Sequence, residues 1–231
     1  MRIGILCAIP KEIEHFDLLA DSGQKLGGRT FFKSQHSLHQ LIVVECGLGK
    51  VNAALASTLL IQVFECELLI FSGVAGGLDP QMKIGEVIVA ESLIQYDYGA
   101  LNDKELTVYR AGNIPMGCPK NGPEFLLNQE IKAIITAALP DVKLGRILTG
   151  DIFLQCEKTR ELLFEKWDAQ AVEMEGGAIA QVAEQFGIST LVVRCLSDLA
   201  GANGEKLNSN FLKNAAETSY QTVQRILAVI F

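Results

Sequence analysis

Residues Ala171 to Asp198, AVEMEGGAIAQVAEQFGISTLVVRCLSD, contain the pattern that decides the fold. A short apolar run (169–174), a Gly-Gly pair, a helical segment (178–186) and a β-branched aliphatic run (190–196) predict strand, helix and strand. Glu175 and Asp198 then follow the carboxyl ends of the two strands, where open α/β sheets bind small ligands. A helix cap at Glu175 and a turn at Asp198 are the structural alternatives.

The composition is that of an ordinary globular protein, with 231 residues of which 49% are hydrophobic and 20% charged. A net charge of -7 without a basic run argues against a nucleic-acid partner, because such binding depends on clustered Lys and Arg. No window is apolar over the length of a membrane span, and the amino end does not read as a signal peptide. We therefore expect a cytoplasmic protein without a membrane partner, in which the six cysteines are free thiols.

Strand and helix patterns alternate along the rest of the chain. The predicted strands are 2–8, 30–33, 40–46, 68–71, 85–94 and 143–148. Helices are predicted to start at Pro10, after the Gly-rich link 47–50, and over 124–138, 157–167 and about 208–230. The helix after the link has its apolar positions at Val51, Ala54, Leu55, Leu59 and Val63. Residues 72–77 are predicted as a Gly-rich loop and 96–123 as a long loop. No interdomain linker is visible, so one α/β domain over residues 1–231 is expected.

Three motifs that suggest cofactor or metal chemistry fail on inspection. The segment Gly47-Leu48-Gly49-Lys50 lacks the glycine that a P-loop needs at position 44 and the Ser or Thr that it needs at position 51. The segment 72–77, SGVAGG, is not a GxGxxG dinucleotide motif. The three histidines are spaced for neither a metal site nor a His-based triad. We expect no metal and no cofactor, so any catalysis must rely on carboxylates.

Five segments occur together in the order and spacing of a known family: GLGKVNAAL (47–55), SGVAGGL (72–78), GD (150–151), VEMEGGAIA (172–180) and RCLSD (194–198). As a set they resemble the nucleoside phosphorylase superfamily, and within it the methylthioadenosine/S-adenosylhomocysteine nucleosidases. The resemblance covers most of the chain. It implies a single-domain three-layer α/β/α fold with a mixed, twisted central sheet, and a homodimer whose neighbour contributes to each pocket. It also implies a small-molecule purine nucleoside as substrate and a place in methionine salvage.

The resemblance further implies catalytic roles. Asp198 resembles the general acid that protonates the imidazole-ring nitrogen of the purine. Glu12 resembles the acid that positions and deprotonates the attacking water, and Arg194 the residue beside that water. Met174 and Glu175 match a ribose-contacting pair. The other positions implied to contact substrate are Phe153 (stacking on adenine), Leu154 (reading the base edge), Leu48 (thioether side), Val74, Ala75, Gly76 and Ser197.

The residue types fit this chemistry without the resemblance. Cleavage of a purine glycosidic bond passes through an oxocarbenium-like state, which calls for a proton donor at the base, a carboxylate near the sugar and an activated water. Glu12, Glu175 and Asp198 can supply these three groups. Hydrolysis is favoured over phosphorolysis, because phosphate needs an Arg-rich anion site and Glu12 would lie where phosphate binds. Lys11 is the one nearby residue that could favour phosphate.

Two alternatives stay open at this point. A nucleoside-binding protein without activity is possible on the same fold, although it would have no reason to keep the water-activating acid. A nucleosidase for another 5′-modified nucleoside is possible because three features depart from the family on the sugar's 5′ side. These are Val74 in place of a small hydroxyl residue, the unusual loop 96–123, and Asn208 where an aromatic residue often packs.

Overall fold

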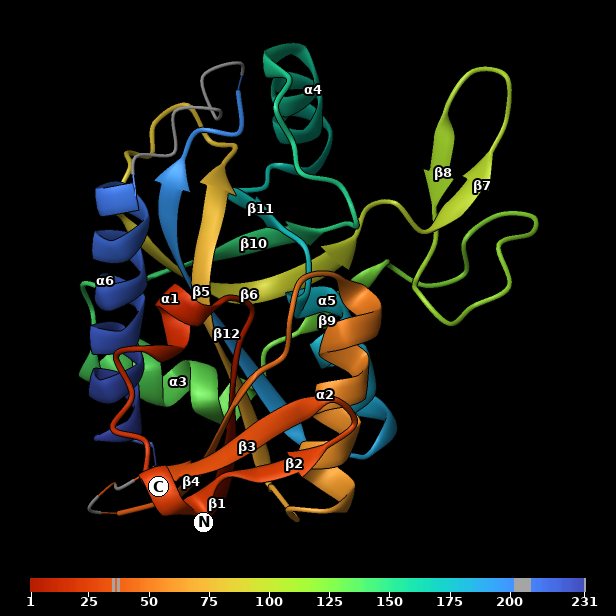
Figure 1. Ribbon diagram of the computed structural model, residues 1–231. Coiled ribbons are helices and arrows are strands. Elements are labelled where there is room, and N and C mark those ends of the chain that lie inside the picture. The colour runs from red at the N-terminus through yellow and green to blue at the C-terminus, as the bar shows by residue number, and fades with distance from the viewer. Residues whose placement is uncertain (35, 37, 202–208, 231) are drawn as a thin grey trace.

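A mixed β-sheet forms the centre of the computed structural model, which describes residues 1–34, 36, 38–201 and 209–230 (Figure 1). Its strands are β1 (Arg2–Cys7), β2 (Gln24–Leu26), β3 (Arg29–Ser34), β4 (Gln40–Glu45), β5 (Leu68–Gly77), β6 (Val87–Gln95), β9 (Glu124–Leu126), β10 (Lys143–Thr149), β11 (Ala171–Glu173) and β12 (Ser189–Asp198). Their order is β11-β10-β6-β12-β5-β1-β4-β3-β2, with β9 beside β6. Because β12 is parallel to β5 but antiparallel to β6, the predicted mixed sheet is confirmed.

Strand β11 closes part of this sheet into a ring. It pairs in parallel with β10 and antiparallel with β5, where Val172 lies opposite Gly76. The five strands β5, β12, β6, β10 and β11 therefore have a neighbour on both sides. Closure brings the residues that follow β11 to the ends of β5 and β12, so Glu175 and Asp198 reach the same end of the sheet.

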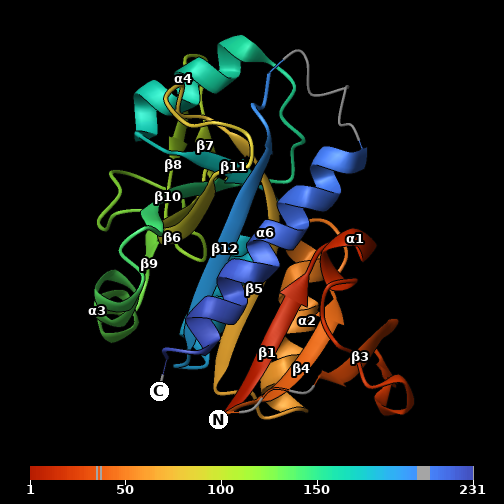
Figure 2. The ribbon, with the colours of Figure 1, turned by 90° about the vertical axis from the view of Figure 1, so that its left-hand side faces the viewer.

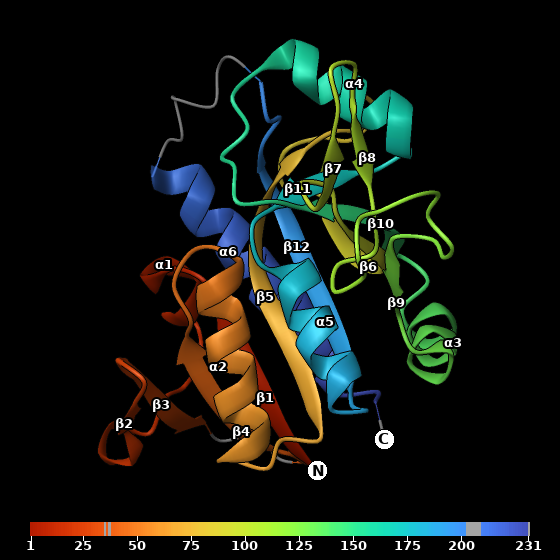
Figure 3. The same ribbon diagram turned by 90° about the vertical axis from the view of Figure 1, so that its right-hand side faces the viewer.

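Helices cover both faces of the sheet, so the expected three-layer α/β/α arrangement is confirmed. On one face lie α1 (Pro10–Ile13), α3 (Gln129–Ala138) and α6 (Ser209–Leu227); on the other lie α2 (Lys50–Gln62) and α5 (Gly176–Gln185). Figure 2 shows α6 across the first face, and Figure 3 shows α2 beside α5 on the second. Helix α4 (Glu157–Trp167) packs near β10 and β11. No helix of the described ranges has the length and apolarity to cross a bilayer.

Three segments differ from the sequence-based expectation. Residues 72–77 are not a loop but continue β5, paired in register with β12. The predicted helix 124–138 begins late: 124–126 form β9, and α3 starts after Asn128, which caps it by accepting the N–H groups of Glu130 and Ile131. The loop 96–123 contains a hairpin, β7 (Gly99–Leu101) and β8 (Leu106–Val108), which projects from the body in Figure 1.

The face of α2 that was expected to be buried is largely exposed. Val51 is 81% exposed, and Leu55 and Val63 are exposed as well. The buried apolar positions are instead Ala53, Ala56 and Leu60, because small residues allow α2 to pack against α5 and the sheet. With apolar residues on both faces, the spacing could not identify the inner one.

The cysteines are free thiols. Those of Cys7, Cys46, Cys66 and Cys195 are buried, whereas Cys118 and Cys156 are exposed. Burial raises the pKa of the Cys46 thiol and, to about 12, that of Cys195. The buried thiols therefore act as small packing groups in the protein interior.

Packing of α2 can be tested at Leu60, whose side chain is fully buried between the helix and the sheet. Leu60→Ala should lower the free energy of unfolding by about 2–5 kcal/mol, because it removes buried methyl groups and leaves a cavity. Urea denaturation measures this change. Leu162→Ala, on the exposed side of α4, is the matched control and should cost less than about 0.5 kcal/mol. Equal losses in the two variants would contradict this packing.

Candidate active site

A cavity of about 350 Å³ lies at the end of the sheet where β1, β5, β11 and β12 finish. Its lining is mostly apolar with a few convergent polar groups, as is usual for small-molecule sites. The predicted site residues that line it are Glu12, Leu48, Val74, Ala75, Gly76, Phe153, Leu154, Met174, Glu175, Ser197 and Asp198. Arg194, the remaining predicted residue, is 1% exposed and lies behind the lining.

Arg194 is the centre of a buried charge cluster. Its Nη2 donates to Glu173 Oε2 at 2.6 Å and to Glu175 Oε2 at 3.3 Å, and its Nη1 lies 4.0 Å from Glu12 Oε1. The guanidinium carbon is 3.6 Å from the centre of the Phe71 ring, a cation–π contact. Burial alone would lower the pKa of Arg194, but the surrounding carboxylates raise it, so the group stays charged.

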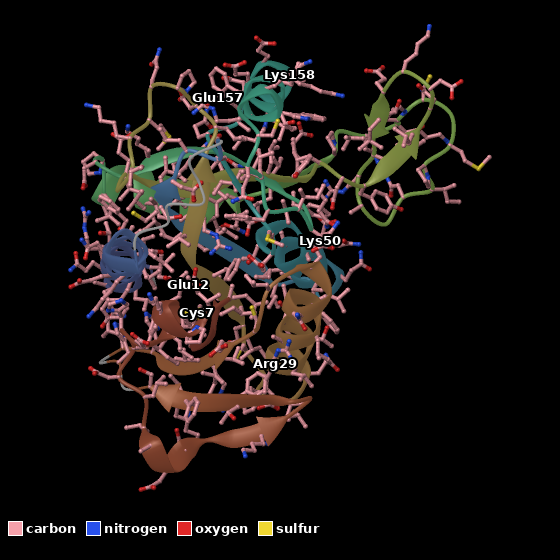
Figure 4. All side chains as sticks on the ribbon, turned by 45° about the horizontal axis from the view of Figure 1, so that its top comes forward. Cys7, Glu12, Arg29, Lys50, Glu157 and Lys158 are labelled. Atoms are coloured by element: carbon pink, nitrogen blue, oxygen red, sulfur yellow. The ribbon has the colours of Figure 1, made fainter. Side chains whose placement is uncertain are left out.

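Glu12 is held at the bottom of the cavity by the backbone that surrounds it. Its Oε2 accepts the N–H of Ala8 at 2.6 Å and that of Ile9 at 3.2 Å, and its Oε1 accepts the N–H of Val74 at 2.9 Å. Figure 4 shows Glu12 in the interior, near Cys7 of β1. Burial raises the pKa of Glu12, opposed by Arg194 and by the three N–H groups. A raised pKa suits a carboxylate that must take up a proton near neutral pH.

Glu173 is a buried member of the cluster that was not among the residues predicted from the sequence. Besides the guanidinium, its Oε2 accepts the N–H groups of Glu175 at 3.0 Å and Gly176 at 2.7 Å, and its Oε1 accepts the Thr149 hydroxyl. It thus caps the start of α5 and fixes Arg194 at the same time. The available signal was a carboxylate inside a strand otherwise made of buried apolar residues, which requires a partner.

Glu175 occupies the N-cap position of α5 but makes no side-chain cap bond, so the capping alternative is wrong. Its Oε1 accepts the Gly49 N–H at 2.7 Å, and the carboxyl group lines the cavity. Burial, and next the charge of Glu173, raise the pKa of Glu175 to about 7. Near neutral pH this group therefore exists in both protonation states.

Asp198 ends β12 at a break in the strand register. Leu196 pairs with Ala75 and Asp198 with Gly76, so Ser197 is an extra residue, and such bulges redirect side chains near functional sites. The Ser197 hydroxyl donates to Oδ2 at 2.9 Å, and the Ala200 N–H to Oδ1 at 2.7 Å. Asp198 therefore both begins a turn and lines the cavity.

Two glycines of β5 make room for the charged side chains. A Cβ atom at Gly73 would collide with Arg194 and Glu12, and one at Gly76 would crowd Asp198 and Ala200. In the structure, their first role is to allow the acids and the arginine to meet.

The rim of the cavity is apolar. Phe153 is 53% exposed, Leu48 is similarly open, and Leu154 is buried beneath them. Asn208, at the position where an aromatic residue often packs, lies outside the described residues. Leu212 of α6 contributes to the lining. No cluster of His, Cys, Asp and Glu suited to a metal ion occurs within the described part of the chain.

Comparisons of sequence and of structure with known proteins agree with one another. The profile of a family described as the Phosphorylase superfamily matches residues 2–228. A 5′-methylthioadenosine/S-adenosylhomocysteine nucleosidase of Mycobacterium bovis is 36% identical, covering 100% of this chain and 98% of its own. The corresponding Helicobacter pylori nucleosidase, solved with butyl-thio-DADMe-Immucillin-A, superposes with a TM-score of 0.86 at 30% identity, covering 100% and 99%. Futalosine hydrolase of Helicobacter pylori gives the same TM-score and identity, covering 100% and 98%.

The raised pKa of Glu175 predicts how stability varies with pH. Below about 4.5, its ordinary value, both folded and unfolded chains hold the proton; between about 4.5 and about 7 only the folded chain does. The contribution of Glu175 to the free energy of unfolding is therefore lost as pH rises through this window, by roughly 3 kcal/mol. Urea denaturation from pH 4.5 to 7.5 should show this decline, and Glu175→Gln should show a smaller one. Parallel curves for the two proteins would contradict the assignment.

Proposed function

Because the chain belongs to the phosphorylase superfamily, we propose that it is a purine nucleosidase acting on 5′-methylthioadenosine, S-adenosylhomocysteine or both. It hydrolyses the N-glycosidic bond and releases adenine and the thio-sugar. The observation that carries this proposal is that Glu12, Glu175 and Asp198, which come from three separate elements, line one cavity with a buried arginine behind it. The named relatives match the chain over nearly its whole length.

Asp198 is the proposed general acid. Departure of the base leaves an electron pair on the purine, and a proton delivered to its imidazole-ring nitrogen stabilises that leaving group. The Ser197 hydroxyl and the Ala200 N–H fix the carboxyl group in place.

Glu12 and Arg194 are the proposed water-binding pair. The 4.0 Å between Arg194 Nη1 and Glu12 Oε1 is too long for a direct hydrogen bond, and a water molecule can bridge such a separation. In this position the water accepts from the guanidinium and donates to the carboxylate. Attack on the sugar carbon forms the new C–O bond while Glu12 takes the proton, as its raised pKa allows.

The remaining contacts orient the nucleoside. Glu175 and Met174 follow β11 and face the sugar, where a carboxylate accepts from a hydroxyl and stabilises the developing positive charge. Phe153 and Leu154 form the side on which adenine would stack. Leu48 would contact the thioether, and Val74, Ala75 and Gly76 would line the ribose as part of β5.

Water is favoured over phosphate as the nucleophile by the charge of the cavity floor. An anion placed there would approach Glu12 and Glu175 as well as Arg194, and Arg194 is already bonded to two carboxylates. Lys11, the cation that could have favoured phosphate, is not among the residues that line the cavity. A nucleoside-binding protein without activity remains the non-enzyme alternative, and the buried, pKa-shifted Glu12 argues against it.

A nucleosidase for another 5′-modified nucleoside is the second candidate. The equal similarity to futalosine hydrolase and to the methylthioadenosine nucleosidase of Helicobacter pylori supports keeping it. The fold and the acids are common to both candidates, so only the 5′ side of the substrate distinguishes them.

The function is tested by incubating the protein with methylthioadenosine, S-adenosylhomocysteine, futalosine, adenosine and inosine, each with and without phosphate. Free base and free sugar should form from at least one thioether nucleoside without phosphate. A sugar phosphate formed only with phosphate would show phosphorolysis, and cleavage of futalosine alone would favour the second candidate. No turnover of any substrate would favour the binding protein.

Asp198→Asn and Glu12→Gln should each reduce kcat by about 10²- to 10⁴-fold, because each removes one proton-transfer group. Both substitutions keep the size of the side chain, so the far-ultraviolet circular dichroism and the melting temperature serve as controls for folding. Near-normal turnover of a folded variant would remove that residue from the mechanism.

We further propose a homodimer in which α2 forms part of the interface. The apolar side chains of Val51 and Leu55, one turn apart in α2, and of Val63, which follows this helix, are exposed. Leu48 and Ile152 at the cavity rim are exposed as well. Exposed apolar side chains that gather in this way are typical of a protein interface. A neighbour bound there would cover the rim and complete the 5′ side of the pocket.

Light scattering tests the dimer. The wild-type protein should have twice the chain mass of 25.1 kDa, and Val51→Asp combined with Leu55→Asp should be monomeric, because two charges would be buried without partners. Leu162→Asp on α4 is the control and should remain dimeric. A monomeric wild-type protein would refute the proposal.

We also infer a cytoplasmic role in methionine salvage. The six free thiols favour a reducing compartment. The proposed products, adenine and a thio-sugar, are those from which such a pathway would start.

A further inference from the structure

The Gly47–Lys50 segment, which lacks the residues of a P-loop, connects to other segments of the chain through Lys50. The Lys50 ammonium group donates to Asp97 Oδ1 at 2.7 Å and lies 3.9 Å from Asp151 Oδ2. The Lys50 N–H donates to Asp151 Oδ1 at 2.8 Å, and the Asp151 N–H donates to Asp97 Oδ2 at 2.9 Å. The three residues thus form a closed ring of contacts, here called the rim clamp, between segments that are distant in sequence.

Lys50 depends on the two carboxylates of the rim clamp because its position in α2 is unfavourable for a cation. Lys50 is the first residue of α2, where a cation is unfavourable because the helix dipole is positive at this end. Asp97 and Asp151 offset that charge. The side chains of Lys50 and Asp97 are only 19% and 18% exposed, so solvent screens their interaction less than that of a surface pair. With two carboxylates beside it, the ammonium group is not available to bind phosphate.

The sequence neighbours of Lys50 and of Asp151 contact the cavity. Gly49, directly before Lys50, donates its N–H to Glu175 Oε1 at 2.7 Å, and its φ of +89° is a conformation suited to glycine. Leu48 lines the cavity one residue earlier. Ile152 and Phe153, directly after Asp151, line the cavity from the other side. Lys50 itself is not part of the lining, and Figure 4 shows it at the start of α2, away from Glu12.

We propose that Lys50 is a positioning residue: through Asp97 and Asp151 it fixes the Gly49 N–H on Glu175 and holds the Leu48 and Phe153 sides of the rim together. This inference rests on the proposed nucleosidase function. Loss of the clamp lets the Gly-rich link move, so that Glu175 loses a hydrogen bond and the substrate loses its fixed rim. Both the binding of substrate and the protonation of Glu175 then change.

The groups around Glu175 determine the direction in which its protonation changes when the rim clamp is lost. Its neighbours are Glu173, Glu12 and Arg194 of the cluster and the buried Cys46 thiol, none of which belongs to the rim clamp. The Gly49 N–H favours the ionised form of Glu175. Without it, the pKa of Glu175 rises further, and a pH–activity profile that requires ionised Glu175 moves its acid limb to higher pH.

The test is Lys50→Met, which keeps most of the side-chain length and removes the charge. We expect kcat/KM for the cleaved thioether nucleoside to fall about 10- to 100-fold, mainly through a higher KM, with an acid limb shifted to higher pH. Asp97→Asn should act in the same direction, and the double variant should lose little more than either single one, because each opens the same ring. Lys50→Arg, which retains the charge, should recover most of the activity.

The matched control is Lys143→Met, which removes a lysine paired with Glu86 on the exposed surface far from the rim and should change neither kcat/KM nor the pH profile. If Lys50→Met lowers only the melting temperature and leaves both readouts unchanged, Lys50 is structural and the inference is wrong. Additive losses in the double variant would also overturn it.

If the wild-type protein cleaves no nucleoside, the proposed function fails separately. The clamp is then tested by ¹³C NMR titration of the glutamate carboxyl groups, with Glu175→Gln identifying the resonance. An unchanged Glu175 titration in Lys50→Met would overturn the inference.

Discussion

One buried guanidinium surrounded by three carboxylates is the constraint on which the rest of the site depends. Removing Arg194 and its partners from water is costly, and the cost is offset only when every charge has closely placed partners. The protein supplies them from several elements: Phe71 below the guanidinium, backbone N–H groups around Glu12, and the start of α5 around Glu173. Burial raises the pKa values of Glu12 and Glu175, and the contacts that offset the cost of burial limit that rise. Stability and proton affinity at this site therefore have a common origin.

The closed ring of strands explains how distant segments reach this cluster. β11 turns back onto β5, where Ala171 and Val172 pair with Gly77 and Gly76, and Glu173 and Glu175 then reach Arg194 of β12. The bulge at Ser197 then directs Asp198 into the cavity at the end of the neighbouring strand. Glu12 enters from a helix of only four residues after β1. No single element contains the site, so its geometry is a property of the sheet as a whole.

Much of the fold and the principal acids could be predicted from the sequence. Strand runs such as 190–196 are apolar and β-branched, and Glu12, Glu175 and Asp198 follow strands, so local patterns located them. Local patterns could not show that residues 72–77 continue β5, because this glycine-rich stretch is held by pairing with β12, more than 100 residues later. Nor could they find Glu173, whose partners come from three other segments, or the inner face of α2, a helix that is apolar all round. These features depend on tertiary contacts.

The position of β12 has a consequence for synthesis of the chain. It is the last strand of the described residues, yet it lies in the middle of the sheet between β5 and β6. Until residue 198 has left the ribosome, both of those strands present unpaired edges, which are prone to pair with other chains. The residues before β12 therefore remain partly folded until this strand pairs with β5 and β6. In that state they are at risk of aggregation. In this protein, β12 and the proposed general acid at its end, Asp198, therefore join the sheet in the same late step.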